Sequence, residues 1–406
     1  MKPKTLRQYD WRKFYRTFLE RSFNILIPLV AILAAFVVSS ILILARGVSP
    51  LEAYGALFSG AFGSANAWAT TIIRLTPLVF TGLAVTYGYR SGFFNIGAEG
   101  QLYLGAMVAT WVGVTFTEWH GLLVIPVSML GAALVGALWA LIPGYLKAAR
   151  GFNEVLTTLL MNYIAIQFFE WSIRVDHISG TVISPLSYLG LKDPTQPFPK
   201  SAVISEAAQL PTVADLITAL GGEVTTPAYN RFTLAAVFAL LAAGLIYVLL
   251  FKTTTGFRAR AVGVNATAAE YMGVDVPRTI ITTALISGAL AGLAGAMEVM
   301  GTQHRVIQNF LVGAGFDGIP VALIGQLHPF GALLSALFFG ALRAGANKMQ
   351  IISGAPIAII YVIQSLAILF AIAGTVVEIR PRFRERKKPQ DAAAPPSVAA
   401  EEAEHV

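Results

Sequence analysis

The sequence predicts an all-α polytopic membrane protein with about ten transmembrane helices and both termini in the cytoplasm. Of its 406 residues, 56% are hydrophobic and only 13% are charged, whereas soluble proteins carry roughly 25% charged residues. The apolar residues gather in runs long enough to cross a hydrocarbon core of about 30 Å, and the few charges lie mainly between these runs. A soluble multidomain enzyme is therefore excluded.

The first predicted span follows a basic segment. Residues 1–21 contain seven Lys and Arg, and 24 uncharged residues follow before Arg46. A cleavable signal peptide is disfavoured, because the apolar run is too long and no small-residue cleavage site precedes a soluble region. We therefore expect a cytoplasmic segment over 1–24, a transmembrane domain over 25–380 and a disordered Ala/Pro/Glu-rich tail over 381–406. Nine further apolar stretches lie near 71–90, 96–116, 121–147, 153–170, 231–251, 279–300, 309–327, 331–348 and 355–377.

Basic residues give the orientation, because short cytoplasmic loops are enriched in Lys and Arg. The external loop over 172–230 has three basic residues against five acidic ones. Pro329 marks either a hairpin between two short helices or a kink in one long helix, and only the hairpin keeps the basic C-terminal tail inside. With the N-terminus inside, the predicted cytoplasmic segments carry Arg90, Lys147, Arg150, Lys252, Arg258, Arg260, Arg278 and the basic run over 380–388.

An internal echo predicts that the two halves of the chain are inverted copies. Residues 92–106 and 315–332 both contain Gly-Phe, Ile, Gly-Gln-Leu and Gly-Ala in that order. The first copy begins on the inside and the second on the outside. Transporters built from such inverted repeats place the substrate at the repeat interface.

The first echo places Asn95, Glu99 and Gln101 in a glycine-dense stretch near or inside the bilayer. An ionised Glu at a helix centre costs roughly 2.5 to 3.5 kcal/mol in the membrane. One interpretation is a broken helix whose backbone and polar side chains line a pathway. The other is a structural carboxylate that caps a neighbouring helix. The same alternatives hold for Asp317 in the second echo, where we favour the structural role.

The fifth predicted helix begins with Asn153 and Glu154, and an acidic first turn is favoured by the helix dipole. Asn153, Thr157 and Thr158 also form a polar stripe, and Asn162 follows on the same helix. Such a stripe indicates either a pathway lining or hydrogen bonds between helices.

The cytoplasmic loop over 252–278 contains a short capped helix. Asn265 suits the N-cap and Gly273 the C-terminal stop, while Thr267 and Glu270 offer an alternative capping box. So short a helix is only marginally stable alone in water. This favours a helix that docks into a groove on a partner protein over an ordinary surface helix. The expected docking residues are Asn265, Ala268, Ala269, Glu270, Tyr271, Met272 and Gly273.

The sequence lacks the common catalytic, nucleotide-binding and metal-binding motifs. There is no P-loop, no His-Glu-x-x-His, no carboxylate cluster for a metal and no cysteine,. We therefore expect neither enzymatic activity nor a metal or cofactor on this chain. The net charge of +7 is explained by topology and by contact with anionic membrane lipid, without nucleic acid.

Four motifs in this order resemble the permease subunits of bacterial ABC importers of the simple-sugar and nucleoside type. They are 95–101 (Asn-Ile-Gly-Ala-Glu-Gly-Gln), 153–164, 263–273 and 315–325. The first motif and the long external insertion resemble the longer permease of nucleoside importers. The resemblance covers roughly residues 25–380, but none of these motifs lies in the 172–230 loop or in the tail.

This resemblance implies ten helices in the bacterial cytoplasmic membrane, with inverted halves of helices two to five and seven to ten. It implies that the 255–274 loop docks an ATPase with two nucleotide-binding halves, which binds the ATP. A substrate-binding lipoprotein would deliver the solute, and a second, shorter permease would complete a heterodimer. A simple-sugar permease remains an alternative, as does an ion-coupled secondary transporter with Glu99 or Asp317 as its coupling carboxylate.

Overall fold

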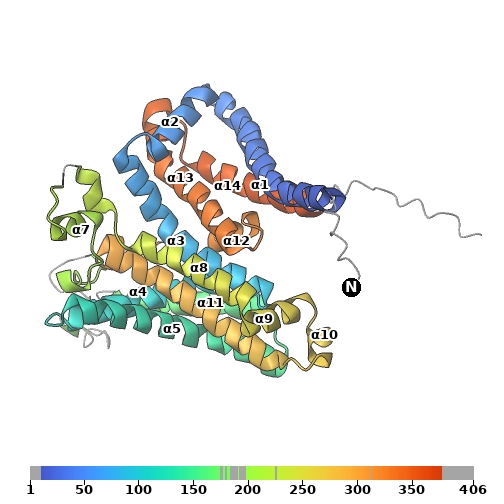
Figure 1. Ribbon diagram of the computed structural model, residues 1–406. Coiled ribbons are helices and arrows are strands. Elements are labelled where there is room, and N and C mark those ends of the chain that lie inside the picture. Colours follow the sequence, from blue (N-terminus) through green and yellow to red (C-terminus); the bar gives the residue numbers. More distant parts are fainter. Residues whose placement is uncertain are drawn as a thin grey trace, which may run out of the picture.

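The computed structural model describes residues 11–173, 177–178, 181–182, 191, 198–224, 226–311 and 313–376. The tail expected over 381–406 and the first ten residues of the basic N-terminal segment lie outside this part of the chain. Helices form most of the described residues (Figure 1). They are α1 (Trp11–Ala45), α2 (Pro50–Phe62), α3 (Ala65–Arg90), α4 (Ala98–Thr115), α5 (Gly121–Arg150), α6 (Glu154–Ile173), α7 (Val213–Ala219), α8 (Ala235–Lys252), α9 (Thr254–Val264), α10 (Ala266–Tyr271), α11 (Val276–Glu298), α12 (Gly318–Ile324), α13 (Pro329–Ser353) and α14 (Ala358–Val376).

Shorter elements complete the described chain. The two-residue strands β1 (His177–Ile178) and β2 (Thr181–Val182) pair antiparallel. Two 3₁₀ turns, η2 (Glu206–Ala208) and η3 (Pro227–Arg231), lie in the long loop, and the π-helical turn η4 (Val299–Gln303) extends α11.

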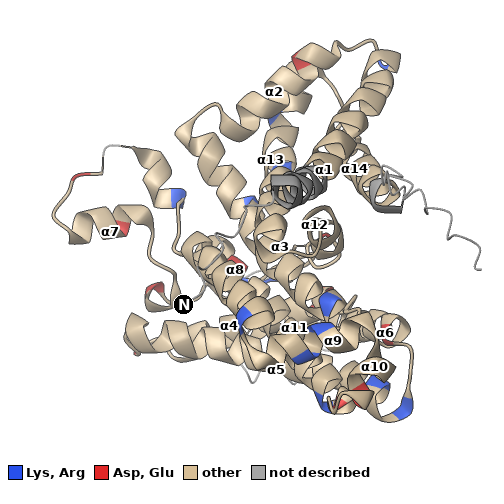
Figure 2. Ribbon diagram, turned by 45° about the vertical axis from the view of Figure 1, so that its right-hand side comes forward, with Lys and Arg blue, Asp and Glu red and all other residues tan. Residues whose placement is uncertain are grey.

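Six of the described helices are long and apolar enough to cross a membrane: α1, α3, α5, α8, α11 with η4, and α13. The helices α4, α6 and α14 run with them but fall short of that length or apolarity. Charged residues are sparse along the bundle, and Lys and Arg gather at the end that carries α9 and α10 (Figure 2). The chain is therefore a multi-pass membrane protein.

The prediction of a helix over 309–327 is wrong for most of that range, because only α12 is helical there. The preceding segment is irregular and contains left-handed residues, including His304 at φ 54° and Asn309 at φ 57°. A Cβ at Gly315 would lie 2.3 Å from the backbone nitrogen of Glu99, so the segment packs against α4 closely enough to require glycine. Pro329 occupies the first turn of α13, which confirms two elements instead of one kinked helix.

The α2 helix was not expected from the sequence. It packs against α13 through small residues, since a Cβ at Gly345 would lie 2.2 Å from the carbonyl oxygen of Leu57. Thr71 on α3 donates its hydroxyl to the carbonyl of Ala61 at 2.8 Å. This 13-residue helix is too short to span the bilayer alone, which is why hydrophobic runs did not predict it.

The helices α5 and α11 cross at glycines. A Cβ at Gly136 would lie 2.3 Å from the carbonyl oxygen of Gly288, and one at Gly292 would lie 2.1 Å from that of Ala132. Association of membrane helices relies on van der Waals contact between closely spaced backbones. These glycines therefore hold the two halves of the chain together.

We expect Gly292→Ala to lower the stability of the folded permease by roughly 1 to 3 kcal/mol, the usual cost of overpacking. Thermal unfolding of the detergent-purified protein measures the effect. Gly244→Ala on α8 is the matched control, because no atom lies within 4 Å of the added Cβ. Similar unfolding temperatures for the two variants would contradict the glycine-contact assignment.

The described part of the long 172–230 loop folds over one end of the bundle. Ser205 donates its backbone N–H to the carbonyl of Gly113 at 2.9 Å, and Leu210 donates to that of Met300 at 2.8 Å. These bonds attach the loop to the ends of α4 and α11. In Figure 1 the loop helix α7 lies at the end opposite α9 and α10.

Candidate functional site

The start of the first echo, residues 92–97, forms a break in the helical path between α3 and α4. The Asn95 side chain bridges the break, donating from Nδ2 to Gln101 Oε1 at 2.8 Å and to Ser287 Oγ at 2.9 Å. Its Oδ1 accepts from the Gly97 N–H at 2.9 Å. Asn95 and Gln101 are each only 1% exposed. These buried bonds join the irregular segment to both α4 and α11.

Two residues of α6 complete this network. Asn162 accepts from the Gly100 N–H and donates to the Ile96 carbonyl, both at 2.8 Å. Thr158 accepts from the Ile96 N–H at 3.3 Å. Backbone groups left free by a helix break must find partners inside a membrane, and α6 supplies them.

The start of the predicted polar stripe on α6 lies outside this network. Asn153 is exposed, and its side chain accepts from the Val155 N–H at 2.9 Å, as a helix N-cap does,. Thr157 donates its hydroxyl back to the carbonyl of Asn153 at 3.2 Å. The structure therefore groups Thr158 and Asn162 with Asn95 and Gln101, and it leaves Asn153 and Thr157 apart.

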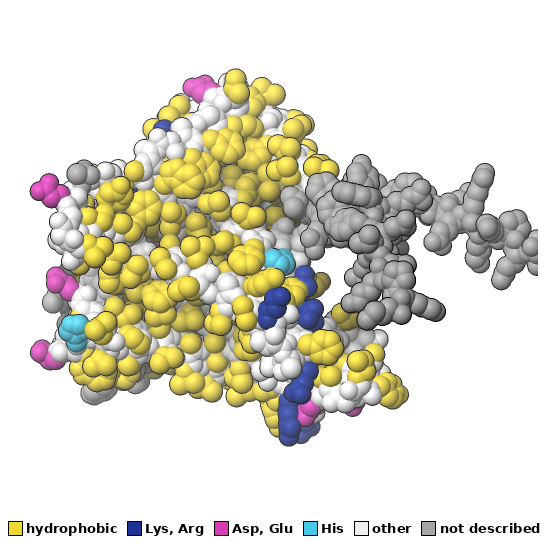
Figure 3. All heavy atoms as spheres, viewed as in Figure 1, with side chains coloured by type: hydrophobic (Ala, Val, Ile, Leu, Met, Phe, Trp, Pro, Cys, Tyr) yellow, Lys and Arg dark blue, Asp and Glu magenta, His cyan; other side chains and the backbone are white. Residues whose placement is uncertain are grey.

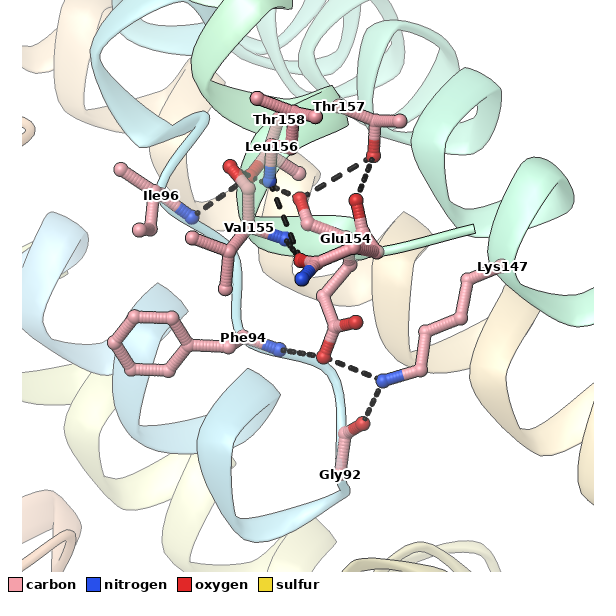
Figure 4. A network of polar contacts seen from close by, with 10 residues as sticks. Gly92, Phe94, Ile96, Lys147, Glu154, Val155, Leu156, Thr157 and Thr158 are labelled. Atoms are coloured by element: carbon pink, nitrogen blue, oxygen red, sulfur yellow. Dashed lines mark hydrogen bonds and ion pairs between the residues drawn. The ribbon is translucent and has the colours of Figure 1, made fainter. Parts of the chain in front are cut away.

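An ion pair fixes the other end of the break (Figure 4). Lys147 Nζ donates to Glu154 Oε1 and to the Gly92 carbonyl, each at 2.5 Å, and Glu154 also accepts from the Phe94 N–H at 3.4 Å. Sequence analysis placed Glu154 in the helix dipole and did not identify this pair. The sequence feature that could have predicted the pair is the opposite charge of Lys147, seven residues before Glu154 and across the left-handed turn at Gly151.

We expect Lys147→Met to destabilise the permease by roughly 1 to 3 kcal/mol, because the Glu154 carboxylate and the Gly92 carbonyl lose a donor. Arg150→Met, an exposed residue of the same last turn, is the control. Thermal unfolding of both purified variants tests this expectation. It fails if Lys147→Met unfolds at the same temperature as the control.

Glu99 connects the two echoes directly. Its carboxylate accepts the backbone N–H groups of Gly313 at 2.7 Å and Gly315 at 2.5 Å, and the residue is 1% exposed. Asp317 lies within electrostatic reach of this carboxylate. In this arrangement Glu99 caps the irregular segment before α12, which is the structural alternative considered for it.

Asp317 forms an ion pair with Arg343 on α13. Their side chains are 24% and 23% exposed, so the pair is partly open to the surface of the chain. Sequence analysis missed Arg343, which lies 26 residues beyond its partner. Its signal was a lone arginine in the middle of an apolar run.

The expected docking helix is present as α10. Asn265 accepts from the Ala268 N–H at 3.0 Å, which confirms it as the N-cap in place of the alternative box. Gly273 ends the helix at φ 81°. Ala269 is buried, whereas Tyr271 is 89% exposed and Met272 is 71% exposed. The helix is thus anchored by one face and presents two large apolar side chains on the other, beside the exposed Glu270.

A bundle of membrane-spanning helices, a hydrogen-bonded helix break and an exposed helix together point to a transport permease. Residues 68–373 match the family described as branched-chain amino acid transport system, permease component. The chain belongs to this family.

The permease is similar to three curated proteins along nearly their whole length. It is 37% identical to the guanosine ABC transporter permease NupP of Bacillus subtilis, over 88% of this chain and 96% of NupP. It is 35% identical to the glucose ABC transporter permease TsgB13 of Haloferax volcanii, over 88% of each chain. It is 33% identical to the nucleoside ABC transporter permease NupB of Lactococcus lactis, over 88% of this chain and 93% of NupB. No solved structure matches the permease significantly.

Two hydroxyl groups of the permease also lie at the site, and sequence analysis did not single them out. Ser287 on α11 accepts from Asn95 and donates to the Ala84 carbonyl at 2.8 Å. Thr81 on α3 donates to the Ala314 carbonyl at 3.1 Å. Each lies in a run rich in small residues that precedes one of the echoes, at 81–84 and 287–295. In such runs, composition alone does not distinguish a hydrogen-bonding residue from a packing residue. Within the described residues, no group of three or more His, Asp and Glu could hold a metal ion.

Proposed function

We propose that this permease is a subunit of an ATP-driven importer in a bacterial cytoplasmic membrane. Its solute is a small polar molecule, and a nucleoside is the first candidate because the names of NupP and NupB specify guanosine and nucleosides. Glucose is the second candidate, on the name of TsgB13. Transport proceeds by alternating access, in which movements of the partner ATPase shift the helices around a central path.

The observation that carries this proposal is the exposed face of α10. A solitary carrier has no need of a capped helix with Tyr271 and Met272 in solvent, whereas a subunit without its own motor needs a contact surface for one. We infer that this face docks an ATPase with two nucleotide-binding halves, which binds the ATP, so this chain needs no cofactor. A substrate-binding lipoprotein on the other side and a second, shorter permease would complete the transporter.

The proposal that the two halves are inverted copies is supported by hydrogen bonds between them. In each half, the helix that precedes its echo bonds to a residue in or beside the echo of the other half. Thr81, on the helix before the first echo, bonds to Ala314 beside the second echo. Ser287, on the helix before the second echo, bonds to Asn95 in the first. We propose that α3–α6 and α11–α14 are the two repeats, with both termini in the cytoplasm.

We propose that the solute path lies along the face of the helix bundle that carries exposed charged side chains within the membrane. Arg74 on α3 is exposed, and the Asp317–Arg343 pair is partly exposed. Such groups are costly against lipid and usually face a bundle interior or a water-filled cavity. We infer that this face meets the path or the second permease, and that Asn95, Glu99, Gln101, Thr158 and Asn162 hold the broken helix behind it.

Competition for uptake tests the solute. Cells that express the complete transporter should take up labelled guanosine, and unlabelled adenosine should compete more strongly than ribose, glucose or leucine. Failure of every nucleoside to compete would overturn the nucleoside assignment, and competition by glucose alone would support the second candidate.

Energy coupling is tested separately. Uptake that survives an ionophore but ceases when ATP is depleted supports the ATPase. The opposite pattern would support the ion-coupled alternative with Glu99 or Asp317. The structure disfavours that alternative, because Glu99 accepts two backbone N–H groups and Asp317 is paired with arginine.

A further inference from the structure

We propose that the permease binds one anionic phospholipid at the end of the bundle that carries α9 and α10. The headgroup phosphate would sit at the guanidinium groups of Arg90 and Arg260, and one acyl chain would lie along α13. This site is independent of the transported solute and of the pathway residues above.

The proposed headgroup site consists of two arginine side chains that contact the same aromatic ring. The guanidinium carbons of Arg90 and Arg260 lie 5.3 Å and 5.2 Å from the centre of the Phe251 ring. No ion pair among the described residues involves either arginine. The Nε atom of Arg260 is also buried without a hydrogen-bond partner in that part of the chain. An anion between the two groups would relieve their repulsion and supply the missing acceptor.

The pair is held in place by its surroundings. Arg90 donates to the carbonyl groups of Leu327 and Gln326, and the His328 ring stacks on Phe251 with 5.5 Å between ring centres. Burial, followed by the charge of Arg90, holds the pKa of His328 below its usual value, which favours the neutral ring.

The remaining charges near the pair are mostly basic. Lys252 ends α8, and Arg258 lies two residues before Arg260 on α9, both exposed. Asp275, the N-cap residue of α11, is already paired with Arg278 at 3.1 Å. The net charge of the site therefore favours an anion.

An apolar track leads away from this headgroup site. Phe330 contacts the His328 ring at 5.9 Å and is followed on the same face of α13 by Leu334, Phe338 and Ala341. The track from 330 to 341 is about 17 Å long at 1.5 Å per residue, close to one leaflet of a core about 30 Å thick. It enters a groove of about 200 Å³ lined by Leu57, Phe58, Ala61, Phe62, Leu334, Leu337, Phe338, Ala341 and Leu342.

The groove fits an acyl chain better than a polypeptide. All nine lining residues are apolar, and a helix with its side chains is about 10 Å across, too wide for a groove of this volume. Figure 3 shows most of the dark blue side chains gathered at one edge of a continuous hydrophobic surface, as expected where headgroups meet the acyl region. Basic pockets between membrane helices recognise anionic headgroups in this way.

Quenching by brominated lipid tests the site in the full-length permease, reconstituted with the subunits that co-purify with it. Leu334→Trp places a fluorophore in the groove, and the difference from the unmodified chain isolates its signal. We expect dibrominated phosphatidylglycerol to quench this signal at roughly 25-fold lower mole fraction than dibrominated phosphatidylcholine, because each of the two arginines contributes about five-fold. Arg260→Gln should reduce that preference by roughly five-fold, since each basic residue near the surface contributes about 1 kcal/mol, and Arg260→Lys should retain most of it.

Arg278→Gln is the matched control, because Arg278 lies in the first turn of α11, is already paired with Asp275 and is 86% exposed. It should leave the preference unchanged. Equal quenching by both lipids, or an unchanged preference in Arg260→Gln, would overturn the proposal. Weak quenching by both lipids would also overturn it, because a protein partner would then cover the groove.

Discussion

Replacing Tyr271 and Met272 by glutamate is expected to abolish ATP-driven uptake while leaving the inserted amount of permease unchanged. Both side chains are largely exposed, so the fold loses few contacts when they change. At a protein interface, large central side chains commonly contribute 2 kcal/mol or more, which corresponds to about a 30-fold loss of ATPase affinity. Uptake, ATPase co-purification and membrane yield should be measured together.

Two variants define the limits of this prediction. Leu220→Glu, on the loop at the opposite end and 82% exposed, should leave ATPase co-purification intact. Ala269→Glu should instead destabilise α10 itself, because Ala269 is buried in a cluster with Phe93 and Ile280. Normal uptake and ATPase co-purification in the Tyr271→Glu/Met272→Glu variant would show that α10 is not the docking surface.

Arg343→Leu is expected to lower both the unfolding temperature and the uptake rate. It leaves the Asp317 carboxylate unpaired between the irregular segment and α13. Breaking a fully buried ion pair costs about 3 to 5 kcal/mol. Because this pair is about a quarter exposed, we expect roughly 1 to 3 kcal/mol, measured by thermal unfolding in detergent.

The double variant Asp317→Asn/Arg343→Gln separates structure from transport. Removing both charges should restore most of the unfolding temperature, because no carboxylate is left unpaired. If the pair also faces the path, uptake stays low in the double variant. Recovery of uptake along with stability would limit the pair to a structural role, and an unaffected Arg343→Leu variant would refute both roles.

Local motifs with a direct physical mechanism were predictable from the sequence. The Asn265 cap and the Gly273 stop depend on backbone geometry within a few residues, and both are present. The buried polar residues of the first echo were also identified, because an amide or a carboxylate in a glycine-dense apolar run requires a partner.

Features that depend on distant partners could not be predicted in this way. The helix expected over 309–327 failed because close packing of Gly315 on Glu99, set by tertiary structure, outweighs local helix propensity. Arg343 and α2 were missed for related reasons, since neither a lone arginine nor a 13-residue apolar helix reveals which element it contacts. The partners of these elements are set only when the two halves pack together.

The bond between Glu99 and the second echo has a consequence for biogenesis. Gly315 follows Glu99 by 216 residues, so at about 5 to 20 residues per second the ribosome needs roughly 10 to 40 s to deliver this partner. During that interval the nascent first half carries an acidic side chain in the membrane without its final ligands. Until the second half arrives, the Glu99 carboxyl group must therefore be protonated, hydrated or bound to other partners.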